Sequence, residues 1–185
     1  ALITISVEDF LGIEKDYEEV EQGKMSIEEF VGKTQSKWIR HGIIFPNVST
    51  KNCYIINYED GDGKKKIVLI HRMDDKNMYS MRFEDINDLL SHRQEWAKIR
   101  KNISEDEFKK YIIGQSQIFM EARKGRWDNG KIGGGVPAIE RDYGWVHIYH
   151  GVSEGPNNRQ YMLGVAISAL NDPAKVIWRA EEPIL

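Results

Sequence analysis

Apolar and polar residues alternate in many short segments of this chain, which is the pattern of half-buried β-strands. Glycine, aspartate, asparagine and proline separate the segments, as turns require. Many short strands at near-even spacing predict an all-β sandwich, barrel or propeller, and the alternation does not separate these three. The predicted strands are 38–45, 53–58, 66–71, 77–82, 96–100, 116–121, 132–139, 145–150, 160–168 and 175–179.

Three segments have helical signals instead. Ser26 is followed three residues later by Glu29, a capping-box signature, with apolar residues at helical spacing behind it. This predicts a mostly solvated helical insertion at about 14–38. Segment 104–112 repeats the signature, and 83–93 has the features of a third short helix.

Length and charge narrow the class of protein. The 185 residues suffice for one domain with a sizeable core, and the net charge is only −3. Lys64-Lys65-Lys66 is the only tight basic cluster, and its neighbours Asp60-Gly-Asp-Gly predict a charged hairpin turn. The chain has no run of about eighteen apolar residues. The composition therefore predicts neither a nucleic-acid nor a membrane partner.

The single cysteine, Cys53, excludes an intrachain disulfide and fits a reducing compartment. It lies in an apolar segment, which favours a small buried core residue over a nucleophile. No signal peptide opens the chain, so we expect a cytoplasmic protein. The start at Ala1, without methionine, predicts a fragment or a processed piece. The five histidines lack metal-ligand spacing, so no metal site is predicted.

Residues 127–151 contain the most informative chemistry. A glycine run that includes Gly134 and Gly135 allows backbone to pass close to a bulky group. A predicted strand follows and ends at Tyr149 and His150, which indicates a polar ligand held against rings. Adjacent strand residues point to opposite faces, so we expect only one of the pair to face a ligand, and we favour His150. Half-buried structural rings are the alternative.

A second candidate pair is His71-Arg72, at the end of the apolar segment Ile67-Val-Leu-Ile. A guanidinium beside an imidazole can bind an oxyanion or sugar hydroxyls, since arginine presents a rigid fork of donors. An ordinary salt bridge with Asp74 or Asp75 is the alternative.

Together, these segments resemble glycoside hydrolase and phosphorylase family 130, the β-mannoside phosphorylases and β-1,2-mannosidases. The family pattern Trp-Asp-x-x-Lys-Ile-Gly-x-Gly, followed by Gly-Trp-Leu-x-Ile-Tyr-His-Gly-Val, is matched within 127–152. The opening Ala1–Phe10, the strand ending in His71-Arg72, and the closing segments from Tyr161 onward are also similar. The resemblance covers nearly the whole chain except about 14–40.

The resemblance implies a five-bladed β-propeller, with residues 1–185 as about its C-terminal half. It implies inverting cleavage of β-mannosides or related oligosaccharides by phosphate or water, without metal or organic cofactor, with phosphate as a potential co-substrate. The implied substrate- and phosphate-binding residues are His71, Arg72, Tyr149, His150, Gly134 and Gly135. Whether the protein forms a homo-oligomer is left open.

Three departures from the family pattern leave other functions open. The family's general acid lies in an Asp-Pro-Arg motif that this chain lacks. Glu59 stands near the place of a phosphate-binding lysine, and could act as a general base or be a solvated hairpin carboxylate. Ala169 replaces an aspartate near the sugar. The alternatives are another five-bladed glycoside hydrolase, acting on arabinan, xylan or fructan, and a non-catalytic sugar-binding propeller.

Overall fold

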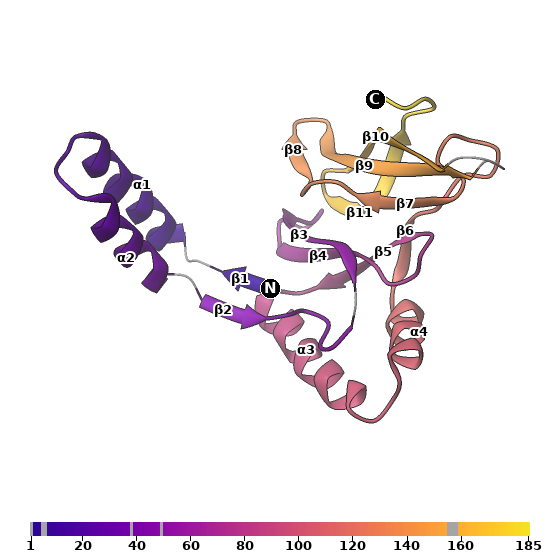
Figure 1. The fold of residues 1–185 in the computed structure, drawn as a ribbon, viewed down its shortest axis with the longest axis horizontal. Coiled ribbons are helices and arrows are strands. Elements are labelled where there is room, and N and C mark those ends of the chain that lie inside the picture. The colour runs from indigo at the N-terminus through magenta and orange to yellow at the C-terminus, as the bar shows by residue number, and fades with distance from the viewer. Residues whose placement is uncertain (1, 5–6, 38, 49, 155–158) are drawn as a thin grey trace. The chain divides into compact units, whose positions relative to one another are not determined.

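The computed structural model describes residues 2–4, 7–37, 39–48, 50–154 and 159–185 (Figure 1). The chain divides into two compact units, Ala1–Pro46 and Asn47–Leu185, and each is described by itself. No helix in the described ranges is long and apolar enough to span a membrane.

The first unit is a helical pair on a short two-stranded sheet. Its elements are β1 (Leu2–Thr4), α1 (Val7–Glu21), α2 (Ile27–Lys37) and β2 (Ile39–Gly42), with β1 and β2 antiparallel. The Ser26–Glu29 capping box forms, because Glu29 N donates to Ser26 Oγ and Ser26 N donates to Glu29 Oε2, each at 3.1 Å. The two helices occupy most of the segment 14–38 that was predicted to be helical, and α1 begins before it, at Val7.

The second unit contains a sheet of four antiparallel strands in sequence order. These are β3 (Lys51–Glu59), β4 (Lys65–Arg72), β5 (Met78–Phe83) and β6 (Gln117–Met120). The predicted hairpin joins β3 to β4: Asp60 N donates to Lys64 O at 2.9 Å, and Gly63 has φ 75°. A left-handed residue in this turn favours glycine.

A second antiparallel sheet completes the β-structure, with the order β11-β10-β9-β7 and β8 paired to β9. Its strands are β7 (Lys131–Gly134), β8 (Ile139–Arg141), β9 (Gly144–Glu154), β10 (Arg159–Ala169) and β11 (Asp172–Arg179). The second unit is therefore mostly β, with two antiparallel sheets, and many short strands are present, as the alternation predicted.

Two helices, α3 (Ile86–Arg100) and α4 (Glu105–Gln115), connect β5 to β6. The predicted strand at 96–100 is wrong, because these residues are the last turns of α3. Asp85 caps the helix through Asn87 N and Asp88 N. Buried Leu89 and Trp96 lie about two helical turns apart on one face. The polar and apolar residues around Trp96, which predicted a strand, thus belong to the last turns of an amphipathic helix.

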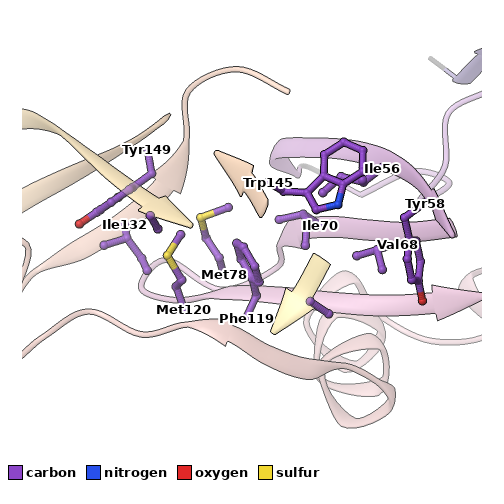
Figure 2. Packing of buried hydrophobic residues seen from close by; sticks show 12 residues of the cluster. Ile56, Tyr58, Val68, Ile70, Met78, Phe119, Met120, Ile132, Trp145 and Tyr149 are labelled. Carbon is purple, nitrogen blue, oxygen red and sulfur yellow. The ribbon is translucent and has the colours of Figure 1, made fainter. Parts of the chain in front are cut away.

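The core of this unit lies between the two sheets (Figure 2). Val68 and Ile70 of β4 face the second sheet, where they join Ile132 of β7 and Tyr149 of β9 in one buried cluster. The other face of β4 is buried too, because His71 reaches Ser116 at the end of α4. Burial on both faces explains the uninterrupted apolar run in β4. Arg72, next after His71, therefore points between the sheets.

Cys53 does not take the predicted place in the core. Its side chain is exposed, although it lies within β3. The neighbouring residue Asn52 has φ 58°, and the β3–β4 register shifts between Lys51 and Tyr54. Tyr54 and Ile56 face the core, so Cys53, which alternates with them, points to the other face of β3.

Candidate functional site

Tyr149 and His150 point to opposite faces of β9, as the alternation predicted. Tyr149 is fully buried between the sheets, whereas His150 is half-buried on the other face. His150 is opposite Gly133 of β7 and Leu163 of β10. Burial lowers the pKa of His150, and the positive charges of Arg72 and Lys131 lower it further. His150 therefore lies close to two permanent cations.

Tyr149 belongs to a buried network on the other face. Its hydroxyl donates to Asp128 Oδ2 at 3.0 Å and accepts from Arg179 Nε at 3.0 Å. The fully buried Asp128 carboxylate also pairs with Arg123 at 3.0 Å. Trp127 stacks on the Tyr149 ring, with centroids 5.6 Å apart. These contacts give Tyr149 a structural role, away from His150.

Arg72 extends from the end of β4 to the second sheet. Its Nη1 donates to the backbone oxygen of Ile132 at 3.2 Å, and the residue is only 8% exposed. Among the ion pairs of the described residues, Arg72 has none with Asp74 or Asp75. Asp74 instead accepts from Tyr79 Oη at 2.6 Å. The alternative of a salt bridge from Arg72 to Asp74 or Asp75 is therefore wrong.

Lys131 lies on the same face of the sheet as His150, because it stands two residues before Gly133, the residue of β7 that is opposite His150. Both Lys131 and Tyr161 are opposite Val152, on either side of β9, so all three side chains project on the His150 face. The Lys131 ammonium is 5.2 Å from the centre of the Tyr161 ring, and that ring is 5.8 Å from the His150 ring. A hydrogen bond from Lys131 lowers the pKa of the exposed Tyr161 phenol.

We call Arg72, Lys131 and His150 the basic cluster. It combines a guanidinium fork, an ammonium group and an imidazole, on strands of both sheets. No acidic side chain is among the groups that shift the pKa of His150. Such a set of donors suits an oxyanion, because charge-assisted hydrogen bonds from arginine and lysine are short and strong.

The glycine run borders this cluster with its backbone. Gly133 is opposite His150, and Gly134 accepts a 2.6 Å hydrogen bond from Asn52 Nδ2. A Cβ on Gly134 would lie 2.8 Å from the Tyr54 ring, so only glycine fits there. Gly135 continues the pairing with β9 through a 2.9 Å bond from its N to Ile148 O. The glycine run was predicted to let the backbone approach a bulky group, and at Gly134 that group is the Tyr54 ring of the protein itself.

His71 does not accompany Arg72 into the basic cluster. It is fully buried on the helix side of β4, 3.0 Å from Ser116 Oγ, and it stacks on Tyr79. Ser116 Oγ donates to Ile112 O at 2.7 Å, so His71 Nε2 is the donor in its bond to Ser116. Burial lowers the pKa of His71 to about 4. A neutral imidazole held in this way has the features of a structural residue.

Glu59 lies at the opposite end of β3 from the basic cluster. It pairs with Lys65 beside the hairpin, whereas Lys51 pairs with Arg72 at the other end of the same two strands. The intervening strand rises about 3.3 Å per residue, so Glu59 cannot touch a ligand held by Arg72. The structure therefore does not bring Glu59 together with the other candidates.

A buried chain of hydrogen bonds supports the strands beneath the site. Tyr54 Oη is 2.9 Å from His147 Nδ1, and His147 Nε2 is 2.8 Å from Ser168 Oγ. Burial lowers the pKa of His147 to about 4 and raises that of Tyr54. These residues connect β3, β9 and β10. These hydrogen bonds hold the Tyr54 ring against Gly134 of β7.

Reasoning from the sequence missed Lys131, Asn52 and Tyr161. Lys131 stands in the Lys-Ile-Gly stretch directly before the glycine run, where its alternation with Gly133 was a usable signal. Asn52 had no signal, because a bulge with positive φ does not follow from a strand pattern. In the described ranges, no three histidine, cysteine, aspartate or glutamate side chains gather as a metal site would require.

The comparisons with known proteins identify the family of this chain. The chain belongs to glycoside hydrolase family 130: the family model, described as beta-1,4-mannooligosaccharide phosphorylase, matches residues 10–185. This confirms the resemblance that the motifs indicated.

Two curated relatives are similar to parts of the chain. A beta-1,2-mannobiose phosphorylase of Thermoanaerobacter sp. (strain X514) is 50% identical over 66 residues, which are 36% of this chain and 21% of the relative. A beta-1,2-mannobiose phosphorylase of Listeria innocua is 38% identical over 73 residues, 40% of this chain and 20% of the relative. The matched stretch is thus only about a fifth of each relative's length.

Solved structures agree with the fold. The beta-1,2-mannobiose phosphorylase from Listeria innocua, in complex with beta-1,2-mannobiose, superposes with a TM-score of 0.52 at 22% identity, over 83% of this chain and 36% of that one. A structure from the GH130 family of mannoside phosphorylases and glycoside hydrolases that target beta-1,2 mannosidic linkages in Candida mannan gives a TM-score of 0.53 at 21% identity, over 83% and 43%.

Proposed function

We propose that this chain is the phosphate-binding part of a family 130 enzyme that cleaves β-linked mannosides by phosphorolysis. The observation that carries the proposal is that two cations, Arg72 and Lys131, lie close to His150 beside strand β7. The names of the curated relatives, all of them phosphorylases, support it.

Phosphorolysis requires the site to hold a phosphate anion beside the sugar. In a single displacement, a phosphate oxygen forms a bond to C1 while the bond from C1 to the leaving oxygen breaks, and a carboxylic acid protonates that oxygen. The Arg72 fork and the Lys131 ammonium offset the phosphate charge in a partly buried place, where Coulomb attraction is stronger than in bulk water. The general acid comes from outside this chain, which has no Asp-Pro-Arg motif.

We also propose the propeller architecture of the family for the whole protein. Two four-stranded antiparallel paths, β3-β4-β5-β6 and β7-β9-β10-β11, have the composition of propeller blades. In each, the first strand would then be the innermost, facing the axis. The Asn52–Gly134 hydrogen bond between β3 and β7 agrees with this arrangement. The remaining blades would close the ring and complete the substrate site.

Hydrolysis is the second candidate function, since the family contains glycoside hydrolases as well as phosphorylases. An inverting hydrolase needs a carboxylate to activate water. Glu59 was the predicted base, but its place beside the β3–β4 hairpin does not favour that role. Phosphorolysis is favoured because basic groups, not acidic ones, surround His150.

The test uses the full-length protein with β-1,2- and β-1,4-mannobiose, with and without phosphate. We expect mannose 1-phosphate to form only when phosphate is present, and the Lys131→Met variant to need at least tenfold more phosphate for half-maximal rate. Lys124→Met is the matched control, because Lys124 precedes β7 and does not belong to the basic cluster. Equal release of free mannose without phosphate would support hydrolysis instead.

A further inference from the structure

Gly133 is a glycine for reasons of space. Among the glycines of the described residues, those with positive φ are Gly23, Gly63, Gly125 and Gly144, so the Gly133 backbone does not require glycine. A Cβ at Gly133 would instead meet two side chains, at 2.6 Å from Asn52 Oδ1 and 2.8 Å from His150 Nε2. Carbon cannot approach these atoms so closely, so the absence of a side chain lets Asn52 and His150 both lie against the Gly133 backbone.

The orientation of Asn52 is fixed by its backbone and by one hydrogen bond. Asn52 has a φ of 58° at the β3 bulge, and its Nδ2 donates to Gly134 O at 2.6 Å. The oxygen of the carboxamide therefore points toward Gly133. A non-glycine residue with positive φ costs free energy, and such strain often occurs at functional sites.

Neither Asn52 Oδ1 nor the His150 imidazole forms a hydrogen bond with any described residue of the chain. His150 has only the ring contact with Tyr161, and the carboxamide only its bond to Gly134. Because both atoms lie within 2.8 Å of the Gly133 Cβ position, their separation is at most the sum of those two distances. A single oxygen between them can therefore reach hydrogen-bond length to both.

The chemistry of this pair differs from that of the neighbouring cations. A carboxamide oxygen only accepts hydrogen bonds, so it attracts a hydroxyl and repels a phosphate oxygen. An imidazole can donate to or accept from the same hydroxyl. The phosphate would thus keep to Arg72 and Lys131, and a sugar hydroxyl would lie between Asn52 and His150.

We propose that Asn52 Oδ1 and the His150 imidazole bind one hydroxyl group of the mannosyl unit, and that Gly133 allows these two groups to lie close enough together to do so. The proposal rests on the proposed function, since it divides the same site into a sugar side and a phosphate side. It adds Asn52 and Gly133 as residues that select a sugar.

The experiment measures the affinity of the full-length protein for D-mannose and for inorganic phosphate, by calorimetry. Asn52→Gly keeps the positive φ and removes the carboxamide. We expect it to weaken mannose binding about three- to tenfold, the value of one neutral hydrogen bond. A Cβ in Gly133→Ala would displace both side chains and should weaken mannose binding more than tenfold. Asn52→Gly should bind phosphate within twofold of the wild type.

Asn47→Gly is the matched control, because Asn47 also has a positive φ, of 52°, and is outside the basic cluster. It should bind both ligands as the wild type does. Unchanged mannose affinity in Asn52→Gly and Gly133→Ala would overturn the inference, as would an equal loss of mannose and phosphate affinity in Asn52→Gly. Arg72→Met separates the two proposals: if it leaves phosphate affinity unchanged, the proposed function fails, whatever the mannose results.

Discussion

The guanidinium of Arg72 donates a hydrogen bond to the backbone oxygen of Ile132, which connects the end of β4 in one sheet to β7 in the other. Ile132 stands between Lys131 and Gly133, so this bond holds Arg72 beside the strand that presents both. The bond uses one of the five N–H donors of the guanidinium. The remaining donors could serve a ligand, so we expect Arg72 to have a binding role in addition to this structural one.

Replacing Arg72 should therefore reduce both ligand affinity and stability. In Arg72→Met, we expect phosphate affinity to fall at least tenfold, and the free energy of unfolding to fall by about 1–3 kcal/mol because the Ile132 oxygen loses its donor. Calorimetry and urea denaturation measure the two effects. Arg141→Met is the control, since Arg141 is exposed at the end of β8. A stable Arg72→Met variant with intact phosphate affinity would contradict the assignment.

The buried Asp128 carboxylate should matter for folding more than for ligand binding. Asp128→Asn keeps the shape but leaves Arg123 and Arg179 without their shared anion. Breaking a buried charge pair costs about 3–5 kcal/mol, so we expect a large drop in the urea midpoint. In Glu181→Gln, an exposed pair with Arg126 is lost, and the expected change is under about 1 kcal/mol. Similar losses in the two variants would refute the network's role.

Acid should destabilise the protein through two buried histidines. The pKa values of His71 and His147 are lowered to about 4 by burial, whereas an unfolded histidine titrates near 6.5. Between these values the unfolded state binds more protons, so stability falls as pH decreases from about 6.5 to 4 and is constant above that window with respect to these groups. Each histidine contributes a loss of up to about 3 kcal/mol.

The variant His147→Gln should be less sensitive to acid, because one of the two titrating groups is gone. We expect its loss of unfolding free energy between pH 7 and 4.5 to be about 2 kcal/mol smaller than that of the wild type. Tyr54→Phe removes a hydrogen bond to His147 but keeps the imidazole. Its pH dependence should match the wild type; an equally flattened curve would show that His147 does not cause the acid sensitivity.

Two glycine substitutions should change stability in opposite directions. Gly144 has φ 137° and a Cβ there would lie 2.3 Å from Ser168 O, so Gly144→Ala should destabilise the protein by about 2 kcal/mol or more. Gly114 is inside α4 with open space around it. Alanine favours a helix by up to about 1 kcal/mol there. Thermal unfolding should therefore show a lower Tm for the first variant and a higher Tm for the second.

Much of the second unit could be predicted from residue patterns. The alternation in β9 correctly separated Tyr149 from His150, and Asp60-Gly-Asp-Gly correctly predicted the β3–β4 hairpin. The family motifs were confirmed by a match over residues 10–185. These predictions succeeded because each depends on local periodicity or local turn chemistry.

The rest required the packing between elements. Whether His71 or Arg72 faces the second sheet depends on α4, which covers the other face of β4. The position of Asn52 depends on a bulge, and the exposure of Cys53 depends on which face of β3 packs against the core. The end of α3 was misread as a strand because Trp96 alternates with polar neighbours over a few residues. A segment of only a few residues cannot separate the 3.6-residue period of a helix from the two-residue period of a strand.

The most direct test of the central claim is a crystal structure of the full-length protein with tungstate, an electron-dense analogue of phosphate. The account predicts one tungstate within hydrogen-bond distance of the Arg72 guanidinium and the Lys131 ammonium, beside the His150 ring. Tungstate bound only elsewhere on the protein, with these three side chains unoccupied at saturating concentration, would contradict it.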